Sequence, residues 1–393
     1  MFLFFSSDGA DMSAAHSPGA LLWTAAQQGD LCQVLLHVCN TTGQGFDNAL
    51  IIAAKNDHEH VVAALLKARE SSCTTYGGVQ ALWFAALSGS TSTVRVLLEA
   101  KASPNIGVRI AWCTTSWPLD AAVSSGRLDS VILLLRAGAT VHSALPLYRA
   151  ALMGYTHIVR ALVAAKMDLD QEAGRQALKA TAMWNFVDVL KVLLEAGMSP
   201  DFFHGSMTPL MWATVQGNDK VMRVLLDAKA DVHLHVRPDG RKVQTACMHA
   251  VVDQDVGALK LLLDARVSVN VPQCMGDNQT GLLLHTAAAS AASLDSFAQP
   301  AIVRALLRAK ADVHGAAGPN AAGPAIVRSP IFAAVTTGSS AAVVRLLLRA
   351  GADLYPCLLD KATTHGSKDV ARALIAHKAQ SAVLELVQKP ARQ

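Results

Sequence analysis

Two short histidine motifs are the residues whose types and spacing come nearest to a metal site. His58-Glu59-His60 and His233-Leu234-His235 each place two imidazoles close together, and imidazole is a common zinc ligand. A zinc site needs three or four ligands, and neither motif supplies that number. We expect both motifs to be polar surface segments, and we predict no bound metal.

Cys247 and His249 form a close pair that could suggest a nucleophile beside a base. Residues two apart on a helix point in different directions, so the pair is not predicted to work together. Cys247 instead falls at a position expected to lie in the core. The sequence also lacks the common phosphate-loop, metalloprotease, hydrolase and kinase motifs. We therefore predict that the chain is not an enzyme and needs no cofactor.

The elements that hold these residues are predicted by a repeated apolar triplet. An apolar residue is followed by two more at +3 and +4, which puts all three on one face of a helix. The triplet recurs at intervals of 27 to 44 residues. Its copies are Val62/Leu65/Leu66, Val94/Leu97/Leu98, Val131/Leu134/Leu135, Val159/Leu162/Val163, Leu190/Leu193/Leu194, Met222/Leu225/Leu226, Leu259/Leu262/Leu263, Val303/Leu306/Leu307, Val344/Leu347/Leu348 and Ala371/Leu374/Ile375.

Turn signals lie at fixed distances from each triplet. Gly, or in some copies Asp57, Asn185 or Gln254, stands eight positions before the second triplet residue, where a shorter preceding helix must end. A second Gly, or Lys in its place, follows the triplet helix, as is typical of a left-handed helix end. The spacing predicts an all-α stack of helix-turn-helix units joined by loops, with apolar seams between neighbouring units.

These residues resemble the ankyrin repeat. The family pattern is followed closely from Thr208 to Gly217 and by Ala230-Asp231-Val232-His233, and again by Ser329 to Ala334 and Gly351-Ala352-Asp353. The resemblance implies an ankyrin-repeat solenoid with projecting hairpin loops. About eleven repeats are expected over 20–378, between short tails at 1–19 and 379–393. The family's histidine is kept only at His285, which implies irregular or weaker ties between repeats.

The resemblance also implies a binding function. The family binds proteins through its loops and its inner helix face, so we predict a non-catalytic module or scaffold for a protein or peptide. The alternative is an adaptor or regulatory subunit of a ubiquitin ligase or kinase complex. The two residues before each turn, such as Leu152/Met153 and Met183/Trp184, form a mostly apolar row that would suit an apolar or extended peptide. Ordinary packing at the edges of repeats is the competing interpretation of this row and of Trp112 and Trp117. The predicted binding residues are Trp112, Trp117, Met153, Trp184, Gln216, Arg237, Asp239, Arg241 and Lys242.

Charge and cysteine usage limit the partners and the compartment. Residues 300–393 carry twelve Lys or Arg and five Asp or Glu, a moderately basic end that fits either an acidic partner or a solvated face. Dense basic patches with aromatics are missing, so no nucleic acid is expected. The seven cysteines are scattered and form no CxxC, which indicates a reducing compartment, the cytoplasm or the nucleus. No apolar run approaches the roughly 20 residues of a membrane span.

Overall fold

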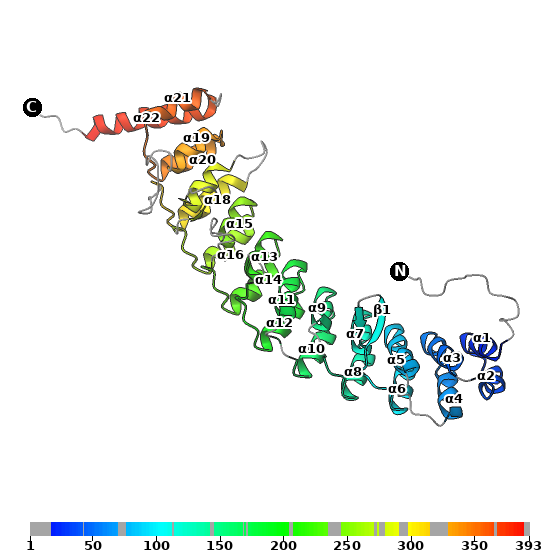
Figure 1. Ribbon diagram of the computed structural model, residues 1–393. Helices are drawn as coiled ribbons and strands as arrows, with labels where there is room; N and C mark the ends of the chain where they lie inside the picture. Colours follow the sequence, from blue (N-terminus) through cyan, green and yellow to red (C-terminus); the bar gives the residue numbers. More distant parts are fainter. Residues whose placement is uncertain are drawn as a thin grey trace, which may run out of the picture. The chain divides into compact units, whose positions relative to one another are not determined.

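The computed structural model consists of helices that follow one another in antiparallel pairs (Figure 1). It describes residues 17–41, 43–69, 76–111, 114–141, 145–167, 169, 172–203, 207–234, 245–270, 273–274, 280–290, 298–314, 329–364 and 368–388. The chain divides into two compact units, called here the N-terminal unit (1–180 with 195–198) and the C-terminal unit (181–194 with 199–393). The all-α repeat architecture predicted from the sequence is confirmed.

The N-terminal unit contains the helix pairs that precede residue 180 and the first part of α11. Its helices are α1 (Pro18–Gln28), α2 (Leu31–Val38), α3 (Gln44–Lys55), α4 (Glu59–Arg69), α5 (Tyr76–Ser88), α6 (Thr91–Glu99), α7 (Pro118–Ser124), α8 (Leu128–Arg136), α9 (Leu145–Leu152), α10 (Thr156–Ala164) and α11 (Glu172–Trp184).

The C-terminal unit begins within α11 and contains the remaining pairs. Its helices are α12 (Val187–Glu195), α13 (Pro209–Val215), α14 (Asp219–Asp227), α15 (Ala246–Val252), α16 (Val256–Asp264), α17 (Leu283–Ala289), α18 (Ala298–Arg308), α19 (Pro330–Thr336), α20 (Ala341–Arg349), α21 (Cys357–Thr364) and α22 (Lys368–Gln388). Helix α22 thus continues past residue 378, where the repeat domain was predicted to end.

Within each unit the helices form two layers. The first helices of successive pairs pack on one another, as in α1–α3–α5–α7–α9 and α13–α15–α17–α19–α21. The second helices do the same in α2–α4–α6–α8–α10 and α14–α16–α18–α20–α22. Within these series each helix contacts its own pair mate and the next helices of its layer, so the apolar seam is continuous along each series.

The buried face of the second helices differs from the predicted triplet in one respect. In α14, Met222 and Leu225 are fully buried, but Leu226 is only half-buried, and Val221 is fully buried instead. The same arrangement recurs around Val159 and Leu162. At 100° per residue, three positions lie on the buried face of these two helices: the one before the triplet, the first triplet residue and the +3 residue. The +4 residue lies at the edge of that face.

The predicted turn positions are confirmed by the backbone. Asp57, Asn185 and Gln254 have φ of 61°, 59° and 57°, the left-handed conformation that Gly supplies in the other repeats. Lys229, which replaces Gly after α14, has φ of 62°, and its N–H donates to the carbonyl of Leu226. These residues end helices at the same register in each repeat, despite the steric cost of a left-handed side chain.

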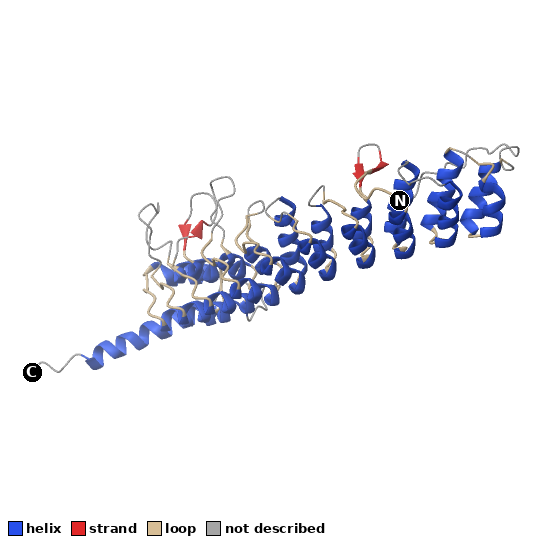
Figure 2. Ribbon diagram, turned by 90° about the horizontal axis from the view of Figure 1, so that it is seen from below, coloured by secondary structure: helices blue, strands red, loops and turns tan. Residues whose placement is uncertain are grey.

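In the described part of the chain, the loops between repeats carry two short antiparallel strand pairs, which match the expected projecting hairpins (Figure 2). In the N-terminal unit β1 (Val108–Ala111) pairs with β2 (Thr114–Ser116), and in the C-terminal unit β3 (Gln273–Cys274) pairs with β4 (Thr280–Gly281). Among the described helices, none combines the length and apolar character that crossing a bilayer requires.

Candidate functional site

Three predicted binding residues lie one position before the left-handed residue that ends a first helix. Met153 in the N-terminal unit is 57% exposed, and Trp184 in the C-terminal unit is 59% exposed. Gln216, at the end of α13, is also exposed, and its N–H donates to the carbonyl of Trp212. The chain reverses just after each of these three residues, so their side chains extend into solvent. The predicted placement is confirmed; the binding role stays a prediction.

Two exposed apolar residues next to the same kind of turn were not among the predicted binding residues. Leu87 in the N-terminal unit is 37% exposed and Val252 in the C-terminal unit is 53% exposed, each two positions before the left-handed residue. The sequence places them in the same register as Leu152 and Val215, which are only half-exposed. Register alone therefore could not separate exposed members from packed ones. We call Trp184, Gln216 and Val252 the turn row of the C-terminal unit.

Trp117 has a different environment. Trp117 lies between β2 and α7 and is half-buried. Its backbone N–H donates to Oδ2 of Asp120 at 3.2 Å. A Cβ added to Gly107 would lie 3.4 Å from the Trp117 indole, so this ring packs against the base of the hairpin. Trp112 lies outside the described residues. The structure therefore places Trp117 at a repeat edge, which was the competing interpretation.

The four charged residues predicted at a hairpin tip, Arg237, Asp239, Arg241 and Lys242, lie outside the described residues. The loop is bounded by Leu234 and by Thr245, whose Oγ1 accepts from the N–H of Met248 and caps α15. Their binding role stays a prediction.

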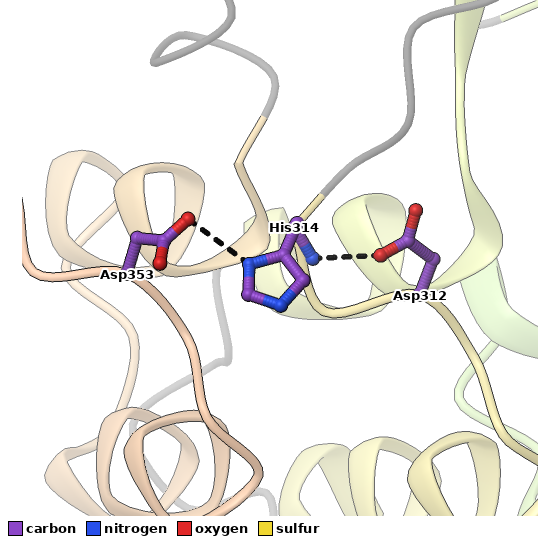
Figure 3. Close-up of polar contacts among 3 residues, drawn as sticks. All are labelled: Asp312, His314 and Asp353. Atoms are coloured by element: carbon purple, nitrogen blue, oxygen red, sulfur yellow. Dashed lines mark hydrogen bonds and ion pairs between the residues drawn. The ribbon is translucent and has the colours of Figure 1, made fainter.

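Polar side chains fasten each loop to the next where the second helices end. In the C-terminal unit, Asn270 donates to the carbonyl of Lys310 at 3.1 Å and accepts from the N–H of Asp312 at 2.8 Å. One repeat further on, Nδ1 of His314 lies 3.0 Å from Oδ2 of Asp353 (Figure 3). The backbone N–H of His314 donates to Oδ1 of Asp312. The His314 and Asp353 side chains are 58% and 59% exposed, so this contact contributes little free energy.

A second set of ties joins repeats at the turn between the paired helices. The side chain of the residue after the left-handed position bonds to a backbone carbonyl. That carbonyl lies near the end of the first helix of the preceding repeat. His58 Nε2 lies 3.1 Å from the carbonyl of Gln27, and Ser339 Oγ donates to that of Ala288 at 2.6 Å. These ties between repeats are made away from the family's histidine position, although that position can make one too. Trp83, which stands at that position in its repeat, donates from Nε1 to Oγ of Ser116 at 3.1 Å.

The residues that could do chemistry have structural roles. His58 makes the tie just described, and the N–H of His233 donates to Oδ1 of Asp231; His235 lies outside the described residues. Within the described part of the chain, no three His, Cys, Asp or Glu side chains converge as a metal ion would require.

Cys247 is fully buried, as predicted, and burial raises the pKa of its thiol to about 12. Burial also lowers the pKa of His249, against the opposing charge of Asp253. A protonated thiol without a basic partner is a poor nucleophile, so this pair does not have the electrostatics of a catalytic dyad.

Comparison with known proteins agrees with this architecture. Residues 22–110, 119–204 and 147–236 match the sequence profile of a family described as ankyrin repeats (3 copies). An ankyrin repeat protein of fowlpox virus (strain NVSL), FPV014, is 28% identical over 159 residues, which is 38% of this chain and 35% of the viral protein. The chain thus spans about a third of the length of this curated relative.

Two solved ankyrin repeat domains match part of this chain. The human ASB11 domain is 26% identical with a TM-score of 0.47, covering 56% of this chain and 98% of that chain. The domain of Bcl-3, a member of the IkappaB family, is 22% identical with a TM-score of 0.46, covering 59% and 98%. The repeat count of about eleven stays a prediction. Because the family profile matches more than half of the sequence, this chain belongs to the ankyrin repeat family.

Proposed function

We propose that this protein is a non-catalytic binding module that holds a protein partner on the turn row of the C-terminal unit. Ankyrin repeats generally mediate protein–protein interaction, and stacked repeats present extended surfaces for it. The observation that carries the proposal is the 59% exposure of Trp184 at the end of α11, together with the 53% exposure of Val252 at the end of α15. Tryptophan is enriched where binding energy concentrates, and repeated exposed apolar positions mark interaction surfaces.

The turn row favours a partner with both apolar and polar groups. Trp184 and Val252 offer apolar area, while Gln216, in the repeat between them, offers an amide donor and acceptor. Hydrogen bonds hold the ends of these helices in place: Asn218 donates to the carbonyls of Ala182 and Met183 at 2.7 and 3.1 Å. A surface fixed before binding loses less conformational entropy when the partner arrives.

Affinity capture with the full chain tests the proposal. The test variant is Trp184→Ala with Val252→Ser, and the matched control is Leu359→Ser with Ile375→Ser, two exposed apolar residues of the same unit outside the turn row. We expect the test variant to lose at least one protein that the unmodified chain retains, while the control keeps it and both variants melt like the parent. Recovery of the same proteins by the test variant and the parent would refute the proposal.

The predicted loop tip can be tested in the same experiment. A third variant changes Arg237, Arg241 and Lys242 to Ala, and loss of the same partner would extend the proposed surface to that loop. The narrower hypothesis of an adaptor in a ubiquitin ligase or kinase complex predicts subunits of such a complex among the captured proteins. It stays a prediction.

A further inference from the structure

The second helices carry a regular pattern of charge. The residue after the first triplet position is Lys or Arg in most repeats, and it is exposed. Four residues later, which is one turn along the same face, an exposed acid follows in four repeats. These pairs are Arg95/Glu99, Lys191/Glu195, Arg223/Asp227 and Lys260/Asp264. Charge on this face is therefore balanced within each of these helices.

Helices α18 and α20 break the pattern in the same way. The acid is replaced by a second arginine, which gives Arg304 with Arg308 and Arg345 with Arg349. Neither helix contains an acidic residue, and all four arginines are exposed. We call these four residues the arginine array. Within the described part of the chain, none of them forms an ion pair.

The four arginines lie on two neighbouring helices. Helix α18 packs directly on α20 inside the C-terminal unit. Four residues along a helix correspond to a rise of about 6 Å, and the axes of packed helices lie about 8–10 Å apart. The array is therefore a compact block of positive charge, with the dimensions of a short peptide segment.

Helix stability explains only part of this arrangement. Arg308 and Arg349 lie in the last turn, where a cation interacts favourably with the helix dipole. Two like charges four residues apart on a helix repel one another, which offsets part of that gain. The dipole also acts on the four balanced helices, yet these end in Glu or Asp. The side-by-side repetition on α18 and α20 points to an external counter-charge.

We propose that the arginine array binds an extended acidic segment of a partner protein. The planar guanidinium group matches a carboxylate in two parallel hydrogen bonds. Alternate side chains of an extended segment lie about 7 Å apart, close to the spacing of two arginines along one helix. The segment would therefore carry acids at every second position. This surface lies on the second helices, whereas the turn row lies at the ends of the first helices, so it goes beyond the proposed function.

The side chains around the array favour a protein over other polyanions. Helices α18 and α20 contain no aromatic residue on which a nucleic-acid base could stack. Neither helix has an exposed large apolar side chain to insert into a membrane surface. The small residues Ala301, Ala305 and Ala342 lie between or beside the arginines and leave room for a peptide backbone.

Fluorescence anisotropy with the full chain tests the inference. The probe is a labelled peptide of alternating Glu and Ser, compared with its Gln counterpart, a single-stranded oligonucleotide and vesicles containing phosphatidylserine. The test variant, Arg308→Asp with Arg349→Asp, restores the charge order of the other repeats and is expected to fold. We expect about tenfold weaker binding of the acidic peptide by this variant, and weaker binding by the parent at higher salt.

Two further variants separate the array from net charge. Arg95→Asp with Arg160→Asp makes the same change in net charge on exposed positions of the N-terminal unit, and binding should stay within about twofold. Asp227→Arg with Asp264→Arg builds a second array on the packed helices α14 and α16 and should strengthen peptide binding. Equal binding of the Gln peptide, preferential binding of the oligonucleotide or vesicles, or unchanged binding by the test variant would each overturn the inference. The turn-row variants leave this assay unaffected, so the two proposals fail separately.

Discussion

The side-chain amide of Asn218 donates to the backbone carbonyl of Ala182 at 2.7 Å, joining two consecutive repeats of the C-terminal unit. The same nitrogen lies 3.1 Å from the carbonyl of Met183. Both carbonyls belong to the last turn of α11, where no intrahelical donor remains. The side chain does not cap its own helix, so its contribution is a tie between repeats.

Removal of this tie is expected to destabilise the C-terminal unit. Asn218→Ala should lower the free energy of unfolding by about 1–2 kcal/mol, because half-buried carbonyls lose their donor. Asn218→His should recover part of the loss, since His58 makes the equivalent contact with Gln27 in another repeat. Urea titration of both variants measures this, with the exposed Lys220→Ala as control at under about 0.5 kcal/mol. Equal stability of Asn218→Ala and the parent would contradict the role assigned to this bond.

The residue types at this tie show what the sequence could and could not predict. Periodicity predicted the turn positions, and the left-handed φ of Asp57, Asn185 and Gln254 confirms them. The partner of the next residue could not be predicted, because His58, Asn218 and Ser339 have little in common except a donor group. Their acceptors lie in the preceding repeat, and contact between repeats does not leave a fixed sequence pattern.

Exposure of the candidate residues was likewise only partly predictable. Register identified Trp184 as solvent-facing, but Trp117, also next to a loop, is half-buried. The difference depends on the hairpin β1–β2, whose base packs on Trp117 through Gly107. The arginine array depends on α18 and α20 being neighbours, which needs the three-dimensional stacking as well as the basic composition near the C-terminus.

The left-handed Lys229 predicts a stabilising glycine substitution. Its φ is 62°, a conformation that costs a side chain about 1–2 kcal/mol relative to a right-handed one. Lys229→Gly removes that cost, and the added flexibility of the unfolded chain offsets about 0.5–1 kcal/mol, so a net gain of about 0.5–1 kcal/mol is expected. Thermal melting measures the gain. Lys220→Gly, inside α14, is the matched control and should lose about 1 kcal/mol. Destabilisation by both substitutions would show that Lys229 makes a contact that outweighs its backbone strain.

Buried and exposed cysteines are expected to differ in reactivity. Burial raises the pKa of Cys247 to about 12, so at pH 8 its thiolate is scarce and the sulfur is inaccessible. Cys32 and Cys39 are exposed on and beside α2. Brief treatment with iodoacetamide, followed by peptide mass spectrometry, should modify Cys32 and Cys39 and leave Cys247 unmodified until denaturant is added. Early modification of Cys247 would mean that α15 opens in the native protein.

His249 should make the stability of α15 depend on pH. Burial lowers the pKa of its imidazole below the ordinary value of 6.5, so the unfolded chain binds this proton more readily than the folded chain. The native state is therefore favoured by this residue above pH 6.5, and that contribution is lost as the pH falls below 6.5 towards the lower folded-state pKa. Urea titrations across this range measure the free energy of unfolding of the parent and of His249→Gln. The other histidines are the same in both proteins, so their contributions cancel in the difference.

The charge of Asp253 provides the control for this linkage. That carboxylate opposes the effect of burial by stabilising the protonated imidazole. Asp253→Asn should therefore lower the folded-state pKa of His249 further and steepen the loss of stability below pH 6.5, while Asp253→Asn combined with His249→Gln should not. Parallel stability curves for the parent and His249→Gln would mean that the imidazole is solvated in the folded protein, and that water reaches the seam between α15 and α16.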